Sequence, residues 1–392
     1  MVSAVFGQTS TSIFESMSRL AAEVKSINLG QGFPEIGLEP AELIEAAIGA
    51  LREGPHQYPP MLGLPALRQA VASNAKRWLG LDIDWEREVL VTSGATEALA
   101  DCFLALLEPG DEIILLEPAY DSYPTIIRRA GATPVQVRLD PPDWQLPLDR
   151  LEAAITPRTR AIVLNTPMNP IGKLFSREEL AGIAALLLKY DLVAICDEVY
   201  EHLVYDGRRH ETLLSFPEVR DRVVRIGSAG KTFSVTGWKV GYVTADAKLL
   251  KPIAKAHQFV TFTTPPALQA AVAFGLNLPD SYFDGLRRDM TRRRDLLVGG
   301  LRQAGFAVDD VAATYFAVAA TGQLPDAGDD FALCQRITRE AGVTAIPISA
   351  FYDARDVHSH IRFCFAKSDQ TLQEAVQRLA RWREGLNWKA AS

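Results

Sequence analysis

The residues best suited to covalent chemistry lie in one short segment, residues 228–242, with the sequence SAGKTFSVTGWKVGY. It combines two lysines, Lys231 and Lys239, with glycines and hydroxyl side chains at a bend between apolar runs. A lysine in such a turn can form a Schiff base with an aldehyde once its neighbours lower its pKa. The small residues also let backbone N–H groups and hydroxyls close on a phosphate. The segment therefore predicts a covalent site for an aldehyde that carries a phosphate.

Two further segments lie where apolar, strand-like runs end. At Ser93-Gly94-Ala95-Thr96-Glu97 a strand passes into a helix, so free N–H groups and the helix dipole favour a phosphate there. An ordinary strand-to-helix turn is the alternative. Asp197 follows the apolar run 192–196 and needs a cationic partner, which the protonated nitrogen of a pyridine ring would supply. For Asp197 the alternative is a helix N-cap or a structural ion pair.

A third segment, residues 165–170 with the sequence NTPMNP, also ends a strand. Proline fixes the backbone and Asn169 offers a directional donor for a phenolate oxygen, although a simple turn is the alternative. The order of the segments carries more weight than any one of them: a phosphate-ready turn, an Asn-Pro loop, a strand-end aspartate and a lysine in a glycine-rich turn. This combination is typical of an enzyme that uses pyridoxal phosphate.

On these residues the chain resembles the class I/II aminotransferases, pyridoxal-phosphate enzymes of fold type I, from about residue 25 to about residue 385. The motifs that carry the resemblance are NLGQGFP at 28–34, NTPxNP at 165–170, DEVY at 197–200 and SxxK at 228–231. The sequence around Lys231 is most similar to the kynurenine, glutamine and methionine aminotransferase branch. The resemblance implies a large domain with a mostly parallel, seven-stranded sheet and a smaller α+β domain.

The resemblance also implies roles for individual residues. Lys231 would form the internal aldimine with pyridoxal phosphate and then move a proton between the substrate and the cofactor. Asp197 would pair with the pyridine nitrogen, and Tyr200 and Asn169 would bond the phenolate oxygen. The remaining cofactor contacts would be Gly94, Ala95, Thr96, Ser228 and Lys239 at the phosphate and Tyr120 against the ring face.

For the substrate, Arg362 in the apolar run 361–365 would grip the α-carboxylate with two parallel donors, helped by the backbone N–H of Gly32. Phe14, Phe262 and Phe351 would line the substrate side chain. Tyr58 would reach a phosphate in a neighbouring subunit, which implies a homodimer with composite active sites.

Short β-rich runs alternate with helical patterns from about residue 89, which predicts a mostly parallel sheet covered by helices on both faces. Ligands of such sheets bind beyond the carboxyl ends of the strands. A capping box at Ser176 and Glu179 predicts the start of a helix that ends at Tyr190. We expect residues 41–285 to form the large domain, and residues 1–40 and 286–392 the small one.

Composition excludes several other classes. The chain has 392 residues and a net charge of −7, which argues against the basic surface of a nucleic-acid-binding protein. The arginines at 287–288 and 292–294 lie in a helix-like segment, and we expect them to form a solvated helix face. Four dispersed cysteines favour reduced thiols, with no metal-binding spacing. No signal segment and no membrane span are predicted, so a cytoplasmic protein is expected.

The leading hypothesis is an aminotransferase that moves the amino group of an L-amino acid to a 2-oxo acid in a ping-pong cycle. A cysteine-conjugate β-lyase on the same site is the nearest alternative, and a non-catalytic ligand-binding protein is a distant one. Thr96, Met168 and Thr263 depart from residues common in relatives and would alter the pocket walls. The aromatic lining favours apolar, aromatic or thioether side chains, or glutamine, over aspartate.

Overall fold

A seven-stranded sheet forms the centre of the computed structural model, which describes residues 3–8, 11–322, 324 and 329–391. Strand β8 runs antiparallel to both its neighbours and the other strands are parallel, which confirms the predicted mostly parallel sheet. Across the sheet the strands are β2 (Val89–Thr92), β8 (Gly241–Ala245), β7 (Val223–Ser228), β6 (Val193–Asp197), β5 (Thr159–Asn165), β3 (Glu112–Glu117) and β4 (Thr133–Arg138).

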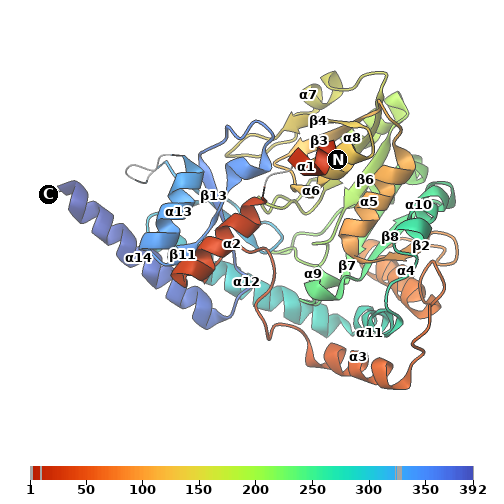
Figure 1. Ribbon diagram of the computed structural model, residues 1–392, viewed down its shortest axis with the longest axis horizontal. Coiled ribbons are helices and arrows are strands. Elements are labelled where there is room, and N and C mark those ends of the chain that lie inside the picture. Colours follow the sequence, from red (N-terminus) through yellow and green to blue (C-terminus); the bar gives the residue numbers. More distant parts are fainter. Residues whose placement is uncertain (1–2, 9–10, 323, 325–328, 392) are drawn as a thin grey trace.

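Helices cover both faces of this sheet (Figure 1). Successive residues of β3 show why: Ile113 and Leu115 belong to one apolar cluster, whereas Ile114 and Leu116 belong to another. Because side chains alternate across a strand, a strand that is apolar on both faces must be covered on both. One face carries α5 (Gly94–Leu106), α6 (Ser122–Arg129) and α10 (Ala247–Val260), and the other carries α7 (Leu148–Ala153) and α8 (Arg177–Tyr190).

A third apolar cluster closes the β2 edge of the sheet. Val89 and Val91 pack there with Tyr242 of β8 and with three helices. These helices are α3 (Ala41–Glu53), α4 (Pro65–Leu79) and α11 (Pro266–Leu276). Helix α12 (Asp280–Gln303) follows and leads from α11 to the rest of the chain (Figure 1).

The remaining elements form a second region beside the main sheet (Figure 1). Its antiparallel sheet has the strand order β12 (Ile346–Pro347), β13 (His360–Cys364), β10 (Phe316–Ala320) and β9 (Ala307–Val308). Strand β1 (Ile27–Asn28) pairs with β11 (Val343–Thr344), so the beginning and the end of the chain meet here. The helices are α1 (Ala4–Gln8), which lies over α6 of the main part, and α2 (Ile13–Val24), α13 (Asp330–Glu340) and α14 (Asp369–Ala391). The domain boundaries at 40 and 285 stay a prediction.

Helix α8 begins where the local sequence signal predicts. At the start of α8 the Ser176 hydroxyl accepts a hydrogen bond from the Glu179 N–H at 3.1 Å, and the Glu179 carboxylate accepts one from the Ser176 N–H at 2.9 Å. This confirms the predicted capping box, which satisfies two N–H groups that the helix itself cannot. Within the described residues, no helix has both the length and the apolar character that crossing a membrane requires.

Candidate active site

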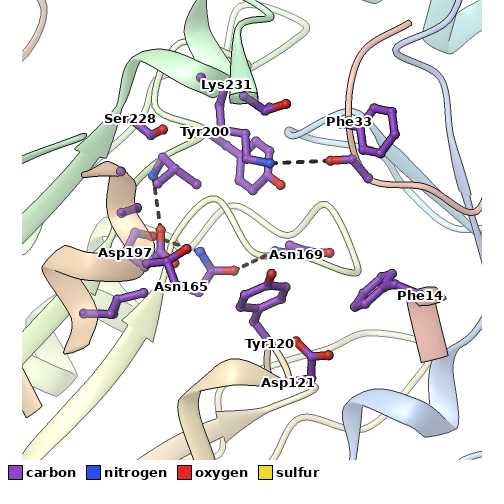
Figure 2. Close-up of a pocket in the computed structure, with 18 of the residues that line it drawn as sticks. Phe14, Phe33, Tyr120, Asp121, Asn165, Asn169, Asp197, Tyr200, Ser228 and Lys231 are labelled. Carbon is purple, nitrogen blue, oxygen red and sulfur yellow. Dashed lines mark hydrogen bonds between the residues drawn. The ribbon is translucent and has the colours of Figure 1, made fainter. Parts of the chain in front are cut away.

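A cavity of about 420 Å³ opens where β5, β6 and β7 end and α5 begins. Figure 2 shows Lys231, Asp197 and Asn169 converging on it from different elements. Most residues predicted to form the site line this cavity together. They are Phe14, Gly32, Gly94, Ala95, Thr96, Tyr120, Asn169, Asp197, Tyr200, Ser228, Lys231, Lys239 and Arg362.

Lys231 lies in the short helix α9 (Ala229–Thr232), directly after β7. Its amine donates to the Tyr315 hydroxyl at 3.1 Å and the Gly32 carbonyl at 3.4 Å. Enclosure by protein lowers the pKa of Lys231 to about 8, with Asp197 opposing and Arg362 assisting the shift. An amine with this pKa is neutral in a useful fraction of molecules near neutral pH, as a nucleophile or a base must be.

Asp197 is the last residue of β6 and is buried. One carboxylate oxygen accepts a hydrogen bond from the Tyr123 hydroxyl at 2.6 Å, but the other has only the Val199 N–H at 3.4 Å. Burial raises the pKa of Asp197, although the Tyr123 and Val199 hydrogen bonds and the charge of Lys231 oppose the shift. A buried carboxylate in this state fits a cationic ring nitrogen as its missing partner.

Arg362 is fully buried on β13, and none of the described residues forms an ion pair with it. It donates to the Asn169 side-chain oxygen at 2.7 Å and to the Gly30 carbonyl at 2.8 Å. Burial lowers the pKa of Arg362 to about 10. Since arginine only donates, the Asn169 oxygen must face Arg362, which leaves the amide N–H₂ as the donor available to the cavity. A buried guanidinium without a carboxylate fits an incoming one.

The end of the cavity expected to hold phosphate combines a helix N-terminus with two side chains. Gly94 and Ala95 begin α5, and Ser228 and Lys239 lie on the same cavity wall. Lys239 has the left-handed backbone (φ 54°), which is uncommon for lysine. A Cβ added to Gly94 would lie 3.2 Å from the Lys239 side chain, so Gly94 permits this close approach. The strained lysine and the free N–H groups together suit an anion.

Aromatic rings shape the opposite wall. Tyr120 and Phe14 lie 6.3 Å apart between ring centroids, and both face the cavity in Figure 2. Phe351 does not line the cavity; it packs edge-on against Phe14 at 5.8 Å and lies 5.2 Å from the Arg362 guanidinium. Phe351 therefore supports the residues that do line it.

Tyr58 and Phe262 lie outside the cavity of the single chain. Tyr58 is 81% exposed, and its ring meets that of Phe262 edge-on at 5.3 Å. Phe262 is 39% exposed and has φ 72°. Neither residue lines the cavity of the single chain, and the roles of Phe262 at the substrate and of Tyr58 at a neighbouring subunit's phosphate stay predictions.

The structure adds residues that the sequence reasoning missed. Tyr123 bonds Asp197, and it stands in the same short segment as Tyr120, which could have drawn attention to it. Asn165 donates to the Asp197 carbonyl at 2.9 Å and accepts from the Asn169 N–H at 2.8 Å. Tyr315 is 84 residues from Lys231, and no pattern in the sequence connects the two.

Comparisons with known proteins give matches in sequence and in overall fold. The family model described as aminotransferase class I and II matches residues 24–379. The structure of N-succinyldiaminopimelate aminotransferase from Mycobacterium tuberculosis is similar, with a TM-score of 0.94, 42% identity, and coverage of 97% of this chain and 100% of that one. The Escherichia coli protein YbdL, described with a methionine aminotransferase function, also gives 0.94, at 36% identity and 97% and 99% coverage. Rat kynurenine–oxoglutarate transaminase 1 is 38% identical, covering 95% of this chain and 96% of the relative.

Proposed function

The chain belongs to the class I and II aminotransferases, and from this premise we propose that Lys231 is the covalent attachment point of pyridoxal phosphate in the cavity. One observation carries the proposal: a lysine with a lowered pKa, an underbonded buried carboxylate and an unpaired buried guanidinium line one cavity. The lysine matches the cofactor aldehyde, the carboxylate matches the ring nitrogen of the cofactor, and the guanidinium matches the carboxylate of the amino acid. The bound cofactor supplies the electron sink for the charge that develops at the amino-acid Cα.

The residues around the cofactor would divide its binding among them. Asp197 would hold the ring nitrogen protonated, and Tyr123 keeps that carboxylate in place. Asn169 and Tyr200 would donate to the ring oxygen. Ser228, Lys239, Thr96 and the N–H groups of Gly94 and Ala95 would hold the phosphate.

Arg362 would orient the substrate by its carboxylate. Its guanidinium is fixed by Asn169, by Gly30 and by the face of Phe316 at 4.0 Å, so little freedom is lost on binding. A Cβ on Gly32 would lie 3.6 Å from an Arg362 nitrogen, so the Gly32 backbone is close enough to share the carboxylate. With the carboxylate held, the Lys231 amine would take the proton from Cα and return it to the cofactor carbon.

We further propose that the amino donor has a neutral side chain: apolar, aromatic, thioether or amide. Among the described residues that line the cavity, the cations are Lys231, Lys239 and Arg362, and each already has a role. Asp121 also lines the cavity and would repel a distal carboxylate. Phe14 and Tyr120 supply apolar surface for such a side chain.

A homodimer would place Tyr58 in the partner's site. Tyr58 contacts Phe262, and close to Phe262 in the chain Phe259 is 83% exposed and Val260 is 53% exposed. Large apolar side chains grouped on a surface mark an interaction site. A second subunit would cover them, and Tyr58 would then reach a phosphate across the interface.

A cytoplasmic location stays a prediction. Its support is chemical: Cys102, Cys196, Cys334 and Cys364 are all buried and unpaired. Buried free thiols are usual where the surroundings are reducing.

The test is reduction of the purified protein with borohydride after incubation with pyridoxal phosphate, followed by peptide mass spectrometry. The label is expected on Lys231, and a label on Lys239 or none would contradict the proposal. A panel of amino donors and 2-oxo acids, scored also for pyruvate and ammonia, then identifies the substrate and separates transamination from β-elimination.

A further inference from the structure

Behind the phosphate end of the cavity lies a buried cluster of three titratable residues, Glu97, Asp101 and His257, whose ligand atoms are within 4.8 Å of one another. Glu97 and Asp101 are one turn apart on α5, and His257 comes from α10. Neither His257 nor Asp101 has exposed surface. Burying polar groups without hydrogen bonds is costly, so the partners of these side chains matter.

Glu97 holds the turn from which the phosphate would be bound. Its carboxylate accepts a hydrogen bond from the Ser93 N–H, the residue that precedes α5. The Ser93 side chain makes no capping hydrogen bond, and Glu97 instead reaches back to the Ser93 N–H, as the acidic residue of a capping box does. The position of Gly94 and Ala95, which follow Ser93, depends on this contact.

His257 extends the connection from Glu97 to another segment. Its Nδ1 lies 2.9 Å from the Glu97 carboxylate and its Nε2 lies 3.1 Å from the Met61 carbonyl. A carbonyl and an ionised carboxylate only accept, so both ring nitrogens must carry protons. Burial lowers the pKa of His257, but the hydrogen bond and charge of Glu97, the charge of Asp101 and the hydrogen bond to Met61 outweigh it, and the net shift is upward. The two ring nitrogens therefore join the Glu97 carboxylate to the Met61 carbonyl.

Met61 lies three residues after Tyr58 and next to Leu62, whose carbonyl accepts from the Val91 N–H of β2 at 3.0 Å. The chain of contacts therefore runs from the Ser93 N–H through Glu97 and His257 to the segment that carries Tyr58. Both ends of this chain are segments assigned to phosphate binding.

We propose that Glu97 and His257 are positioning residues for the cofactor phosphate: through the Ser93 N–H they fix the turn that binds it, and through the Met61 carbonyl they fix the segment that carries Tyr58. The inference rests on the proposed cofactor site and assigns to it two residues that do not line the cavity. Asp101 is close to the pair, with an oxygen 3.8 Å from His257 Nδ1, but neither of its oxygens accepts a hydrogen bond within the described structure. Asp101 therefore makes no hydrogen bond in the relay and acts on it only through its charge, which favours the protonated form of His257.

The experiment compares the dissociation constants of pyridoxal phosphate and of pyridoxal, which lacks the phosphate, for the cofactor-free protein. Glu97→Ala and His257→Ala should weaken pyridoxal phosphate binding roughly 10- to 100-fold, the change expected for a lost hydrogen bond to a charged group. Pyridoxal binding should change less than about threefold. Glu97→Gln should stay near wild type, because its amide can accept from Ser93 and donate to a neutral His257.

Two variants serve as controls. Glu179→Ala removes a glutamate that likewise accepts from the N–H at the start of a helix, α8, away from the cavity. Asp101→Asn changes the carboxylate next to the relay. Glu179→Ala should lower the melting temperature, and both should leave the two dissociation constants unchanged.

The inference fails if Glu97→Ala lowers the melting temperature as Glu179→Ala does without changing affinity, or if pyridoxal and pyridoxal phosphate weaken equally. If Glu97→Ala does not fold, His257→Ala and Glu97→Gln still test the inference. His257→Ala should lose the preference for pyridoxal phosphate over pyridoxal, and Glu97→Gln should keep it. Absence of borohydride labelling of the wild type would instead refute the cofactor site itself.

Discussion

Asp197 and Glu198 are adjacent in sequence and both buried, yet they belong to two different kinds of region. Asp197 faces the cavity with one well-formed side-chain partner, Tyr123. Glu198 accepts from Arg225 at 2.7 Å and Thr212 at 2.6 Å, and lies 2.9 Å from the His210 ring. The Asp197 carboxylate therefore has hydrogen-bonding capacity left for a ligand, whereas both oxygens of Glu198 have close partners within the protein.

Two buried arginines show the same difference. Arg225, 2% exposed, pairs with Glu198 and Glu201, and these carboxylates outweigh burial and raise its pKa. Arg362, 0% exposed, has no such partner in the part of the chain that the structure describes, and burial lowers its pKa to about 10. A buried cation whose charged form is stabilised serves the fold, whereas one whose charged form is destabilised is available to a ligand.

Arg225→Met should give the largest loss of stability. It leaves Glu198 and Glu201 buried without their cation, at a cost of about 3 to 5 kcal/mol in the free energy of unfolding. Denaturant titration of the cofactor-free protein measures it. A loss below about 1 kcal/mol would mean that the cluster does not stabilise the fold.

Arg362→Met should act chiefly on catalysis. The substrate carboxylate would lose its charge partner, which should raise the activation free energy by about 2 to 5 kcal/mol. This corresponds to a fall in kcat/KM of roughly 30- to 5000-fold. The free energy of unfolding should fall less than in Arg225→Met, because only carbonyl acceptors lose their donor. Unchanged kcat/KM would remove Arg362 from the substrate site.

The lowered pKa of Lys231 predicts how cofactor attachment depends on pH. With a pKa of about 8, the neutral amine rises from roughly one tenth at pH 7 to roughly nine tenths at pH 9. The rate at which cofactor-free protein attaches pyridoxal phosphate should therefore rise about tenfold over this range. Stopped-flow absorbance measures the rate, and a continued steep rise above pH 9 would indicate an ordinary lysine pKa.

Two tyrosine substitutions give the smallest and most closely matched test. Tyr242 donates to Glu201 at 3.1 Å and Tyr123 donates to Asp197 at 2.6 Å. Tyr242→Phe should lower the free energy of unfolding by about 1 kcal/mol and leave cofactor affinity unchanged. Tyr123→Phe removes a hydrogen bond that opposes the upward pKa shift of Asp197, so it should weaken cofactor binding several-fold, most at low pH. If Tyr242→Phe and Tyr123→Phe changed the affinity for the cofactor equally, the two regions would not differ in function as we infer.

Much of the site could be predicted because its parts are carried by local signals. Asp197 ends a strand and Asn169 and Lys231 each follow one, and the apolar runs of these strands are visible in the sequence. Parallel strands bring their carboxyl ends to one edge, so these residues had to meet. Tyr315 and His257 come from outside this set of strands, and their contacts depend on packing between distant segments.

The sequence by itself determined the alternation of strands and helices, the cap of α8, the residues able to do chemistry and the edge of the sheet where they gather. These follow from backbone preferences and side-chain periodicity, which act over a few residues. Only the tertiary structure decided which of two neighbouring carboxylates is fully bonded, which buried arginine is left without a partner, and how far the pKa of Lys231 falls. Those properties depend on burial and on charges brought together from distant parts of the chain, which no local pattern encodes.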